Sequence, residues 1–294
     1  MWAAARRKCL GRRGFFTSRR ETGIMTLRQG GGDMGIPILK MLAPIPKIEG
    51  HKNAVFVGPH PDDIEVGAGG TAAKLAASGA RVTFVVTTDG GAGAMTRSTD
   101  MAALIATRKR EATASARLLG VNDVVFLDFP DGGEYSAWEL AKKLAELFAR
   151  ISPDIVFAPD PRLPSEIHPD HIKCGEAVNT AVVMSGFPLI MKRNQVPFDE
   201  TIPLEPRKTL CFYYTHRTNR IVGLTKAQFA LKLASIACHE SQFPIGATDE
   251  TRLLKAYLAL RARRFGCRVF KRFAEGFCVF APLHQHAFPE IQQY

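Results

Sequence analysis

The stretch "FVGPHPDDIEVGAGG", residues 56–70, decides the fold of this chain. It continues an apolar run, "NAVFVG" over residues 53–58, through a His-Pro-Asp-Asp turn into a helical segment of small residues. An apolar run that ends in a turn and passes into a helix is typical of the first unit of a parallel α/β sheet. The turn also crowds Asp62, Asp63 and Glu65 together, and carboxylates are rarely buried without a partner. These acids therefore require a partner at the end of the first strand.

The same alternation of strand and helix continues along the chain. Short apolar runs predict further strands at residues 81–88, 123–129, 153–159 and 209–216. Helical periodicity and capping residues predict helices at residues 69–79, 98–120, 136–151, 168–184, 225–243 and 250–266. This alternation predicts a Rossmann-like α/β fold with a mainly parallel sheet, helices on both faces and right-handed crossovers. We expect the C-terminal part to be irregular.

The net charge of +11 is concentrated at the N-terminus. Residues 1–50 carry ten Lys/Arg and three Asp/Glu, a net charge of +7, whereas the other 244 residues carry +4. A nucleic-acid-binding domain keeps its basic charge on the folded body, so no nucleic-acid partner is expected. We expect residues 1–50 to be a basic, disordered extension and residues 51–294 to form the functional domain. A transit peptide is an alternative for the extension, as is a start codon assigned too early.

Cysteine spacing indicates the redox compartment of the protein, and hydropathy indicates whether the chain crosses a membrane. The six cysteines are scattered without a CxxC pair, which indicates neither a disulfide framework nor a thiolate zinc site. We expect them to be reduced, in the cytoplasm. No apolar run reaches the roughly 18 residues of a membrane span, so no transmembrane segment is predicted. The sequence leaves a homo-oligomer open.

Two polar clusters follow strands of the predicted sheet. His60 and Asp63 come directly after the first strand, and His168 and His171 follow the fourth strand across a loop. Ligands of open α/β sheets collect beyond the carboxyl ends of the strands, so both clusters face the same edge. A spacing of three residues puts each pair of side chains on one face of a turn or helix. Imidazole and carboxylate together suit zinc or another first-row divalent ion.

A divalent cation would also compensate the adjacent acids Asp62 and Asp63. One carboxylate can bind the metal while its neighbour takes a proton from metal-activated water. The constellation therefore predicts a metal-dependent hydrolase. Two other functions stay open. Two histidines and a carboxylate also form the facial triad of non-haem Fe(II) oxygenases, and the chain could be a non-catalytic relative that only binds sugar.

Three stretches resemble the zinc-dependent N-deacetylases of the LmbE/PIG-L family. They are "GPHPDDIEVGAGGTAAK" at residues 58–74, "RKREATASARLLGV" at 108–121 and "HPDH" at 168–171. The resemblance covers most of residues 52–290 and implies removal of acetyl from a small-molecule N-acetylglucosamine or its conjugate, with zinc, or Fe²⁺ in its place. "HESQF" at 239–243 and "FAEGF" at 273–277 are similar to the bacillithiol-pathway branch, which acts on N-acetylglucosaminyl-malate.

The resemblance implies roles for individual residues. His60, Asp63 and His171 would bind the metal, Asp62 would be the general base, and His168 would be the electrostatic or general-acid partner. Alternatives from local structure stand beside two of these roles. Asp62 could cap the turn that follows it, and His168 could cap the helix that begins at the second motif.

The resemblance also implies that Asp170 orients a ligating histidine and that Arg108, in an Arg-x-x-Glu pattern, reaches the substrate. Asp170 could instead be a first-turn acid that favours the helix dipole, and Arg108 a solvated charge on a helix face. Glu65 departs from the common family pattern, in which a glutamate follows the second Asp directly. Here Ile64 intervenes, as in the bacillithiol branch, and no role is predicted for Glu65.

Three further features carry weaker expectations. The glycines of "GAGG", residues 67–70, should let the first helix pack closely behind the metal turn. The run "RARRFGCR", residues 261–268, reads as the exposed face of a helix with at best a weak anion-binding role. His239 shows no ligand spacing to another histidine, and no role is predicted for it.

Overall fold

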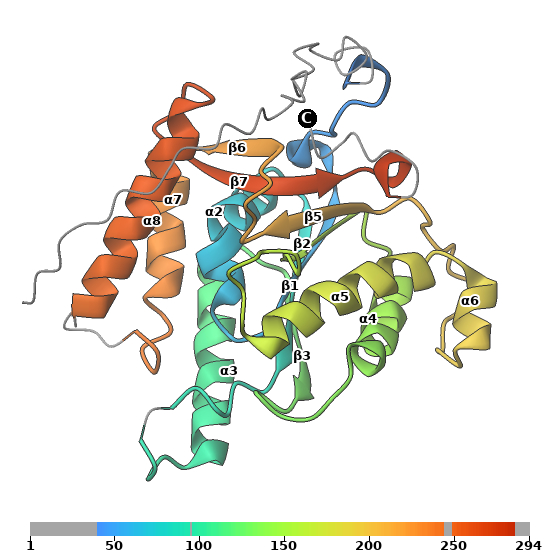
Figure 1. Cartoon of the computed structure of the whole chain (residues 1–294), viewed down its shortest axis with the longest axis horizontal. Helices are drawn as coiled ribbons and strands as arrows, with labels where there is room; N and C mark the ends of the chain where they lie inside the picture. Colours follow the sequence, from blue (N-terminus) through green and yellow to red (C-terminus); the bar gives the residue numbers. More distant parts are fainter. Residues whose placement is uncertain (1–39, 95, 244–248, 286–294) are drawn as a thin grey trace, which may run out of the picture. The chain divides into compact units, whose positions relative to one another are not determined.

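The computed structural model describes residues 40–94, 96–243 and 249–285, and these residues all belong to one compact unit. Their strands form a seven-stranded sheet in the order β3-β2-β1-β4-β5-β7-β6 (Figure 1). The strands are β1 (Asn53–Gly58), β2 (Arg81–Thr88), β3 (Asp123–Phe129), β4 (Ile155–Pro159), β5 (Thr209–Tyr213), β6 (Arg220–Leu224) and β7 (Phe273–Phe280). The strands β1 to β5 are parallel, and β7 runs antiparallel to both β5 and β6. The predicted α/β class with a mainly parallel sheet is confirmed.

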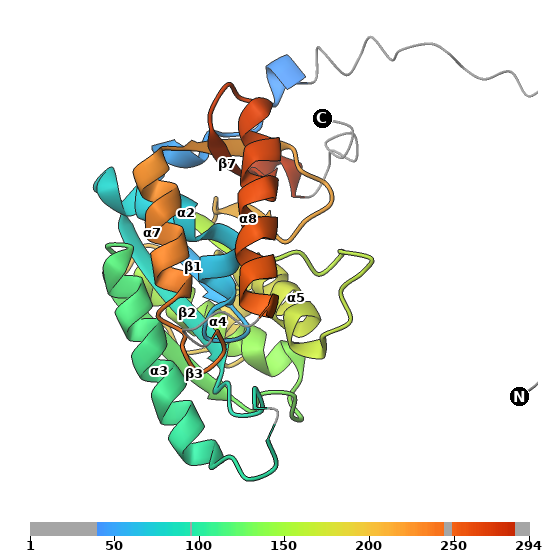
Figure 2. The ribbon, with the colours of Figure 1, turned by 90° about the vertical axis from the view of Figure 1, so that its left-hand side faces the viewer.

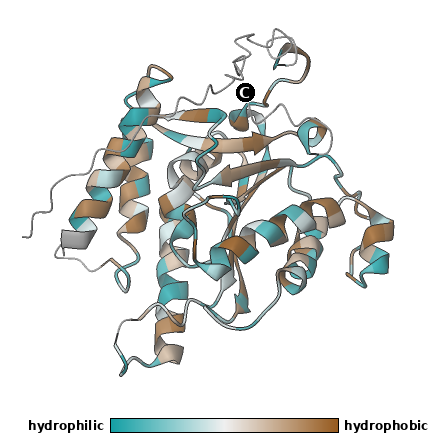
Figure 3. Cartoon of the chain, viewed as in Figure 1, coloured by the Kyte–Doolittle hydropathy of each residue, from teal (hydrophilic) through white to brown (hydrophobic). Residues whose placement is uncertain are grey.

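Helices cover both faces of this sheet. They are α2 (Asp63–Ala77), α3 (Met101–Leu118), α4 (Ala137–Ile151), α5 (Pro169–Met184), α6 (Pro188–Arg193), α7 (Lys226–Ile236) and α8 (Asp249–Cys267). The helices α2, α3, α7 and α8 lie on one face, and α4 and α5 lie on the other (Figures 1 and 2). Each face of the sheet has its own hydrophobic core, and alternate side chains of β1 pack into the two cores. Phe56 packs on the first face, and Val55 and Val57 pack on the second. Hydrophobic colouring accordingly runs along the strands, whereas hydrophobic and hydrophilic residues alternate along helices such as α4 and α5 (Figure 3).

Local signals explain where the helices begin. Asp100 caps α3, because its side chain accepts hydrogen bonds from the backbone N–H groups of Ala102 and Ala103 at 2.9 and 3.2 Å. Ser136 and Glu139 form a capping box at the start of α4. Pro169 is the first residue of α5, as predicted, since its missing N–H costs nothing there.

The order of the strands creates a switch point between β1 and β4. β2 and β3 extend the sheet on one side of β1, and β4 and β5 extend it on the other. Such a switch point leaves a crevice beyond the carboxyl ends of the two strands. Residues 60–63 follow β1 and residues 168–171 open α5 after β4, so both polar motifs are brought to this crevice.

The C-terminal part is more regular than predicted. β7 is paired on both sides, and its Glu275 is tied to α2. The carboxylate of Glu275 accepts hydrogen bonds from the backbone N–H groups of Gly70 and Thr71 at 3.1 and 2.7 Å, and it pairs with the buried ammonium of Lys232. A Cβ at Gly70 would lie 2.4 Å from Leu224 and 3.2 Å from Glu275, so the close packing expected of the "GAGG" glycines is present. The sequence pattern missed this edge because Gly70 and Glu275 are 205 residues apart.

The packed domain begins before residue 51. Ile48, in a short 3₁₀ helix (Ile48–Gly50), is fully buried in the core. The carbonyl oxygen of Ala43 lies 3.0 Å from Nε2 of His284. The last residues of the predicted extension therefore belong with the domain, because they bury apolar surface against it. Residues 1–39 lie outside the described residues, and the extension there stays a prediction.

None of the helices in the described ranges is long and apolar enough to cross a membrane. The five cysteines that the structure describes are free: Cys174, Cys211, Cys238, Cys267 and Cys278. The cytoplasmic location and a homo-oligomer stay predictions.

The stack of Phe56 on Phe157 is the central contact of the first core. Their ring centroids are 4.0 Å apart, and both side chains are fully buried. We expect Phe157→Ala to lower the free energy of unfolding by about 3–5 kcal/mol, because it leaves a cavity under β1. Denaturant unfolding would measure this. Phe270→Ala, at a side chain that is 97% exposed, is the control and should change stability by less than about 0.5 kcal/mol. Equal effects of the two substitutions would contradict the assignment of the core.

Candidate metal centre and active site

Asp63 is the meeting point of the two polar motifs. Its Oδ2 accepts a hydrogen bond from the backbone N–H of His60 at 3.0 Å and lies 3.0 Å from Nδ1 of the same residue. Nε2 of His171, from the second motif, lies 3.4 Å from the same oxygen. Burial alone would raise the pKa of Asp63, but the hydrogen bonds from His171 and His60 outweigh it and hold the pKa below its usual range. Asp63 is therefore an ionised carboxylate between two imidazoles.

His60 is surrounded by carboxylates on its other side. Its Nε2 lies 3.2 Å from Oδ1 of Asp131 and 3.4 Å from Oδ2 of Asp170. Burial lowers the pKa of His60, but the hydrogen bonds to Asp131, Asp170 and Asp63 outweigh it and raise the pKa to about 12. The pKa of His171 is raised in the same way, with burial opposed by Asp63 and Glu166. The protons on these imidazoles supply the positive charge that the acidic cluster needs.

A divalent cation fits this donor set. The ligand atoms of His60, Asp63 and His171 all lie within 4.8 Å of one another. Those of a second group, which shares His60, do so too: His60, Asp131, His168 and Asp170. A bound cation would replace the protons on the imidazoles and neutralise the carboxylates. The three residues predicted as ligands from the sequence are thus brought together, and their donor chemistry suits zinc.

Asp62 is held in a strained backbone conformation beside these groups. Its φ of 148° and ψ of −26° are rare for a residue with a side chain. It makes no side-chain capping hydrogen bond to α2, so the local alternative of a helix cap is wrong. Burial and then the charge of Asp63 raise the pKa of Asp62 above its usual range. Strain of this kind persists only where the surroundings enforce it, and it gathers at functional sites.

Arg108 is buried rather than solvated. Its side chain is 3% exposed, so the alternative of a solvated charge on a helix face is wrong. The guanidinium donates a hydrogen bond to the carbonyl oxygen of Gly90 at 2.8 Å and lies 3.4 Å from Oδ2 of Asp62 and 3.9 Å from Oδ2 of Asp131. Its Nε–H makes no hydrogen bond. Arg108 therefore positions Asp62, and the predicted contact with substrate stays a prediction.

Asp170 and His168 combine structural and chemical roles. Nδ1 of His168 accepts a hydrogen bond from the backbone N–H of Asp170 at 3.3 Å, so His168 does cap α5. Its ring nevertheless lies 4.7 Å from that of His60, centroid to centroid, and remains exposed. Asp170 is fully buried, and it accepts hydrogen bonds from the hydroxyl of Tyr135 at 2.9 Å and the N–H of Gly132 at 2.8 Å. Asp170 is thus fixed against His60 rather than left as a free first-turn acid.

Similarity to known proteins agrees with this arrangement. The PIG-L family model, described as GlcNAc-PI de-N-acetylase, matches residues 55–182. A diacetylchitobiose deacetylase from Thermococcus kodakarensis is 34% identical over 227 residues, which cover 76% of this chain and 82% of that protein. The chain belongs to the PIG-L/LmbE family.

Two further relatives extend the comparison. The structure of N,N'-diacetylchitobiose deacetylase from Pyrococcus horikoshii, complexed with its inhibitor MPG, aligns with a TM-score of 0.72 at 36% identity. That alignment covers 81% of this chain and 87% of the other. A 1D-myo-inositol 2-acetamido-2-deoxy-alpha-D-glucopyranoside deacetylase from Kineococcus radiotolerans is 29% identical over 175 residues, 49% of this chain and 48% of that protein. These relatives do not single out the bacillithiol branch, so that narrower resemblance stays a prediction.

Sequence reasoning missed three residues in this PIG-L/LmbE site. Asp131 follows β3 in a Pro-Asp-Gly-Gly turn, and its position at the carboxyl end of a strand was the available signal. Glu166 has Oε2 3.1 Å from Nδ1 of His171. Tyr214 donates a hydrogen bond to the carbonyl oxygen of Asp63 at 3.2 Å, and its ring stacks over that of His171. Glu166 stands two residues before the second motif and contacts His168 and His171 within the same loop and helix start, whereas Tyr214 meets Asp63 and His171 only across the fold.

The structure also explains Glu65 and His239. Oε1 of Glu65 lies 3.3 Å from Nε2 of His239 and accepts a hydrogen bond from the hydroxyl of Ser115 at 2.6 Å. Both side chains are almost fully buried. Burial would lower the pKa of His239, but Glu65 outweighs it and raises the pKa. The pair joins α2 to the segment after α7 and lies behind Asp62, whose pKa His239 lowers. Glu65 is therefore a buried partner of His239 in this family member.

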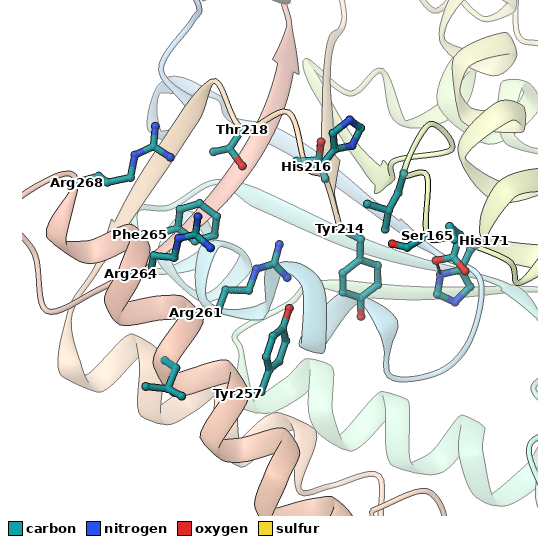
Figure 4. A pocket seen from close by; sticks show the side chains of 14 residues that line it. Ser165, His171, Tyr214, His216, Thr218, Tyr257, Arg261, Arg264, Phe265 and Arg268 are labelled. Carbon is teal, nitrogen blue, oxygen red and sulfur yellow. Dashed lines mark ion pairs between the residues drawn. The ribbon is translucent and has the colours of Figure 1, made fainter. Parts of the chain in front are cut away.

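A pocket of about 860 Å³ lies beside the metal centre (Figure 4). His171, Glu166 and Tyr214 line one part of it. Tyr257 and Arg261 of α8 line another, and the side chain of Arg261 extends from the helix towards Tyr214 (Figure 4). A space of this size accommodates a small organic ligand next to the histidine of the second motif.

The strain at Asp62 can be measured by comparing two substitutions. Asp62→Gly removes the carboxylate and relaxes φ, whereas Asp62→Ala removes the carboxylate and keeps the strain. In chelator-treated protein we expect the glycine variant to be more stable than the alanine variant by about 1–3 kcal/mol. Denaturant unfolding of both variants gives this difference. Equal stability would show that the backbone at Asp62 is relaxed.

Proposed function

We propose that the protein is a metal-dependent hydrolase that removes the acetyl group from an N-acetylglucosamine unit. The observation that carries the proposal is the convergence of His60, Asp63 and His171 next to the strained acid Asp62, at the edge of a pocket. The names of the diacetylchitobiose and inositol-conjugate deacetylases among its relatives support the substrate class. Membership of this family disfavours the oxygenase hypothesis. In addition, a facial-triad oxygenase would leave Asp62 without a role.

His60, Asp63 and His171 would hold the metal, with zinc the ion that this donor set suits best and Fe²⁺ the alternative. When bound, such an ion lowers the pKa of water to about 7 and polarises a carbonyl group. Glu166, beside Nδ1 of His171, would orient that ligand. Asp170, with Tyr135 and Gly132 as hydrogen-bond donors, would do the same for His60.

Asp62 is the general base in this proposal. Its side chain keeps 15% exposure at the crevice, and its raised pKa suits proton transfer near neutral pH. Asp62 takes a proton from the attacking water as the water oxygen bonds to the acetyl carbon. The same proton then passes to the amide nitrogen as the carbon–nitrogen bond breaks. Acetate and a free amine result, and Asp62 returns to its ionised form.

Two basic side chains would assist this transfer. His168 lies near His60, and because its Nδ1 accepts the hydrogen bond from Asp170, its Nε2–H would be the donor that stabilises the negative charge on the acetyl oxygen. Arg108 holds Asp62 from behind through its contacts with Gly90 and Asp131. Its guanidinium, 3.4 Å from Oδ2 of Asp62, would hold that carboxylate in place.

Asp62→Asn tests the general base. We expect kcat for acetate release to fall by about 10²–10⁴-fold while metal content stays near that of the wild type, because the amide keeps the shape and loses the basic oxygen. Asp128→Asn is the control, at a 52%-exposed side chain that pairs with Lys109 on the surface, and it should leave kcat unchanged. Loss of metal together with activity would mean that Asp62, not Asp63, is the ligand. Acetate release from no N-acetylglucosamine derivative, by metal-loaded wild type, would favour the non-catalytic relative.

His171→Ala tests the metal site. We expect this variant to lose its metal under mild chelation that the wild type survives, because one of three ligands is gone. Elemental analysis after dialysis measures the metal-to-protein ratio. His216→Ala is the matched control, since His216 lines the same pocket without contacting Asp63. An unchanged ratio in His171→Ala would remove His171 from the ligand set.

A further inference from the structure

We propose that one end of the molecule binds a membrane surface that contains anionic lipids, with the ring of Phe270 inserted at the level of the head groups. Phe270 lies in the turn between α8 and β7, and Arg268, Lys271 and Arg272 are exposed beside it. We call residues 268–272 the basic turn. It projects at the top of the molecule in both views, and no step of the proposed deacetylation uses it (Figures 1 and 2).

The conformation of Phe270 is unfavourable for folding alone. The N–H of Lys271 donates a hydrogen bond to the carbonyl oxygen of Gly266 at 2.9 Å, which is the bond that closes a helix in a Schellman motif. This motif puts Phe270 at the position where glycine is usual, with φ at 53°. A bulky side chain at positive φ is strained, and 97% of this one is exposed. Glycine would avoid both costs, so the ring is suited to contact with a partner outside the domain.

The basic turn has a firm base. A Cβ at Gly266 would lie 2.4 Å from the carbonyl oxygen of Lys271, so the turn packs directly on the last turn of α8. A Cβ at Gly223 of β6 would lie 2.8 Å from Cγ of Lys271, so the stem of the lysine packs on the edge of the sheet. These contacts fix the backbone on both sides of Phe270 and present its ring at the tip of the turn.

Positive charge is concentrated around Phe270. Residues 261–272 contain six Lys/Arg and no acid, whereas residues 51–294 carry a net charge of only +4. Among the described residues, no carboxylate oxygen lies within 4.0 Å of the charged groups of Arg268, Lys271 or Arg272. Uncompensated cations that are grouped on one surface attract an anionic partner.

The exposed helix face predicted for the run "RARRFGCR", residues 261–268, is confirmed in part. Arg263 and Arg264 are exposed on α8, as expected, but Arg261 is half-buried and lines the pocket. Arg268 lies beyond the end of α8, in the basic turn. The run therefore leads from the helix into the proposed membrane contact, and a weak anion-binding role within the helix stays a prediction.

A second exposed apolar point lies at the same end of the molecule. Residues 40–42 also project at the top of both views, and Met41 and Leu42 are 74% and 70% exposed (Figures 1 and 2). Residues 1–39, which precede this point in the chain, carry eight Lys/Arg and two Asp/Glu. An extended surface contacts such separate points together, and stable attachment to a membrane takes an apolar insertion together with a basic segment.

A membrane fits this end better than a second copy of the chain does. A two-fold contact would set Arg268, Lys271 and Arg272 of one copy against the same residues of the other, and like charges repel. A stable protein interface also buries about 800 Å² on each partner, with complementary shape. A single projecting phenylalanine ring needs only a soft apolar layer, and cations beside it pair with anionic head groups.

Co-sedimentation of the full chain with vesicles tests the inference. Vesicles of phosphatidylcholine alone are compared with vesicles that contain about 30 mol% phosphatidylserine, whose surface attracts each nearby Lys/Arg by about 5-fold in the partition coefficient. We expect the partition coefficient of the wild type to be at least about 10-fold higher on the anionic vesicles, and the difference to shrink at about 1 M salt. Equal binding to the two kinds of vesicle, or binding to neither, would overturn the inference.

Two aromatic and aliphatic variants locate the insertion. Phe270→Ala should lower the partition coefficient on the anionic vesicles by about 10-fold or more, because the inserted ring is lost. Leu189→Ala, at a 79%-exposed side chain of α6 away from this end, is the control and should bind like the wild type. Equal binding of the wild type and Phe270→Ala would overturn the inference, because attachment would then not use the turn.

Two double variants locate the charge. Lys271→Gln/Arg272→Gln should lower the partition coefficient on the anionic vesicles by about 20–30-fold at low salt, which is the loss of two cations. Lys142→Gln/Lys143→Gln, in α4, removes the same charge elsewhere and should have little effect. The N-terminal segment is present in all of these variants and contributes equally to each. Equal losses in the two double variants would show a response to net charge alone and would overturn the inference.

Light scattering in the absence of vesicles tests the other occupant of this surface, a second copy of the chain. We expect Phe270→Ala to have the same molar mass in solution as the wild type. A lower molar mass in Phe270→Ala would show that Phe270 contacts a second copy, and it would overturn the membrane contact. None of these measurements uses acetate release, so they decide the inference whether or not the proposed function holds.

Discussion

The site depends on one constraint, which is the compensation of carboxylates gathered at the switch point of the sheet. Asp63, Asp131 and Asp170 follow three different strands and converge on His60 and His171, and Asp62, next to Asp63 in the chain, lies against Arg108. Their mutual repulsion would open the crevice if no positive charge lay among them. In the metal-free protein, imidazolium groups and Arg108 provide that charge. In the proposed metal-bound enzyme, a divalent ion would provide it. The need for positive charge at this crevice is thus a property of the fold, and the proposed metal would meet the same need.

Around this centre, each acid receives a partner suited to its task. Asp63 is kept ionised by two imidazoles, while Asp62, next to it in the chain, has its pKa raised by burial and by Asp63 itself. In the proposed mechanism, environment alone therefore separates two adjacent carboxylates into a ligand and a base. Behind them, the buried pair of Glu65 and His239 connects α2 to the chain that follows α7. The same face carries α8, whose Tyr257 and Arg261 line the pocket, so the support of the proposed base and one wall of the pocket come from one layer of helices.

The two His-Pro-Asp motifs lie within residues 55–182, the range that the family model matches. Tyr257 and Arg261, which line the pocket, lie outside that range, on α8. In α/β enzymes the strand ends supply the chemistry, and later segments shape what is bound. The C-terminal helices are accordingly where this chain can differ from its relatives in substrate while it keeps the same reaction.

The sequence by itself determined the strand–helix alternation, the parallel sheet and the pairing of the two His-Pro-Asp motifs at one edge. These features depend on local periodicity and on the rule that strand ends share an edge, and both can be read along the chain. Only the tertiary structure decided that Arg108 is buried against Asp62, that Glu65 pairs with His239, and that Asp131 joins the cluster. It also decided which arginines of residues 261–268 face the pocket. Each of these depends on contacts between segments far apart in sequence, and local spacing carries no information about which distant residue will be opposite.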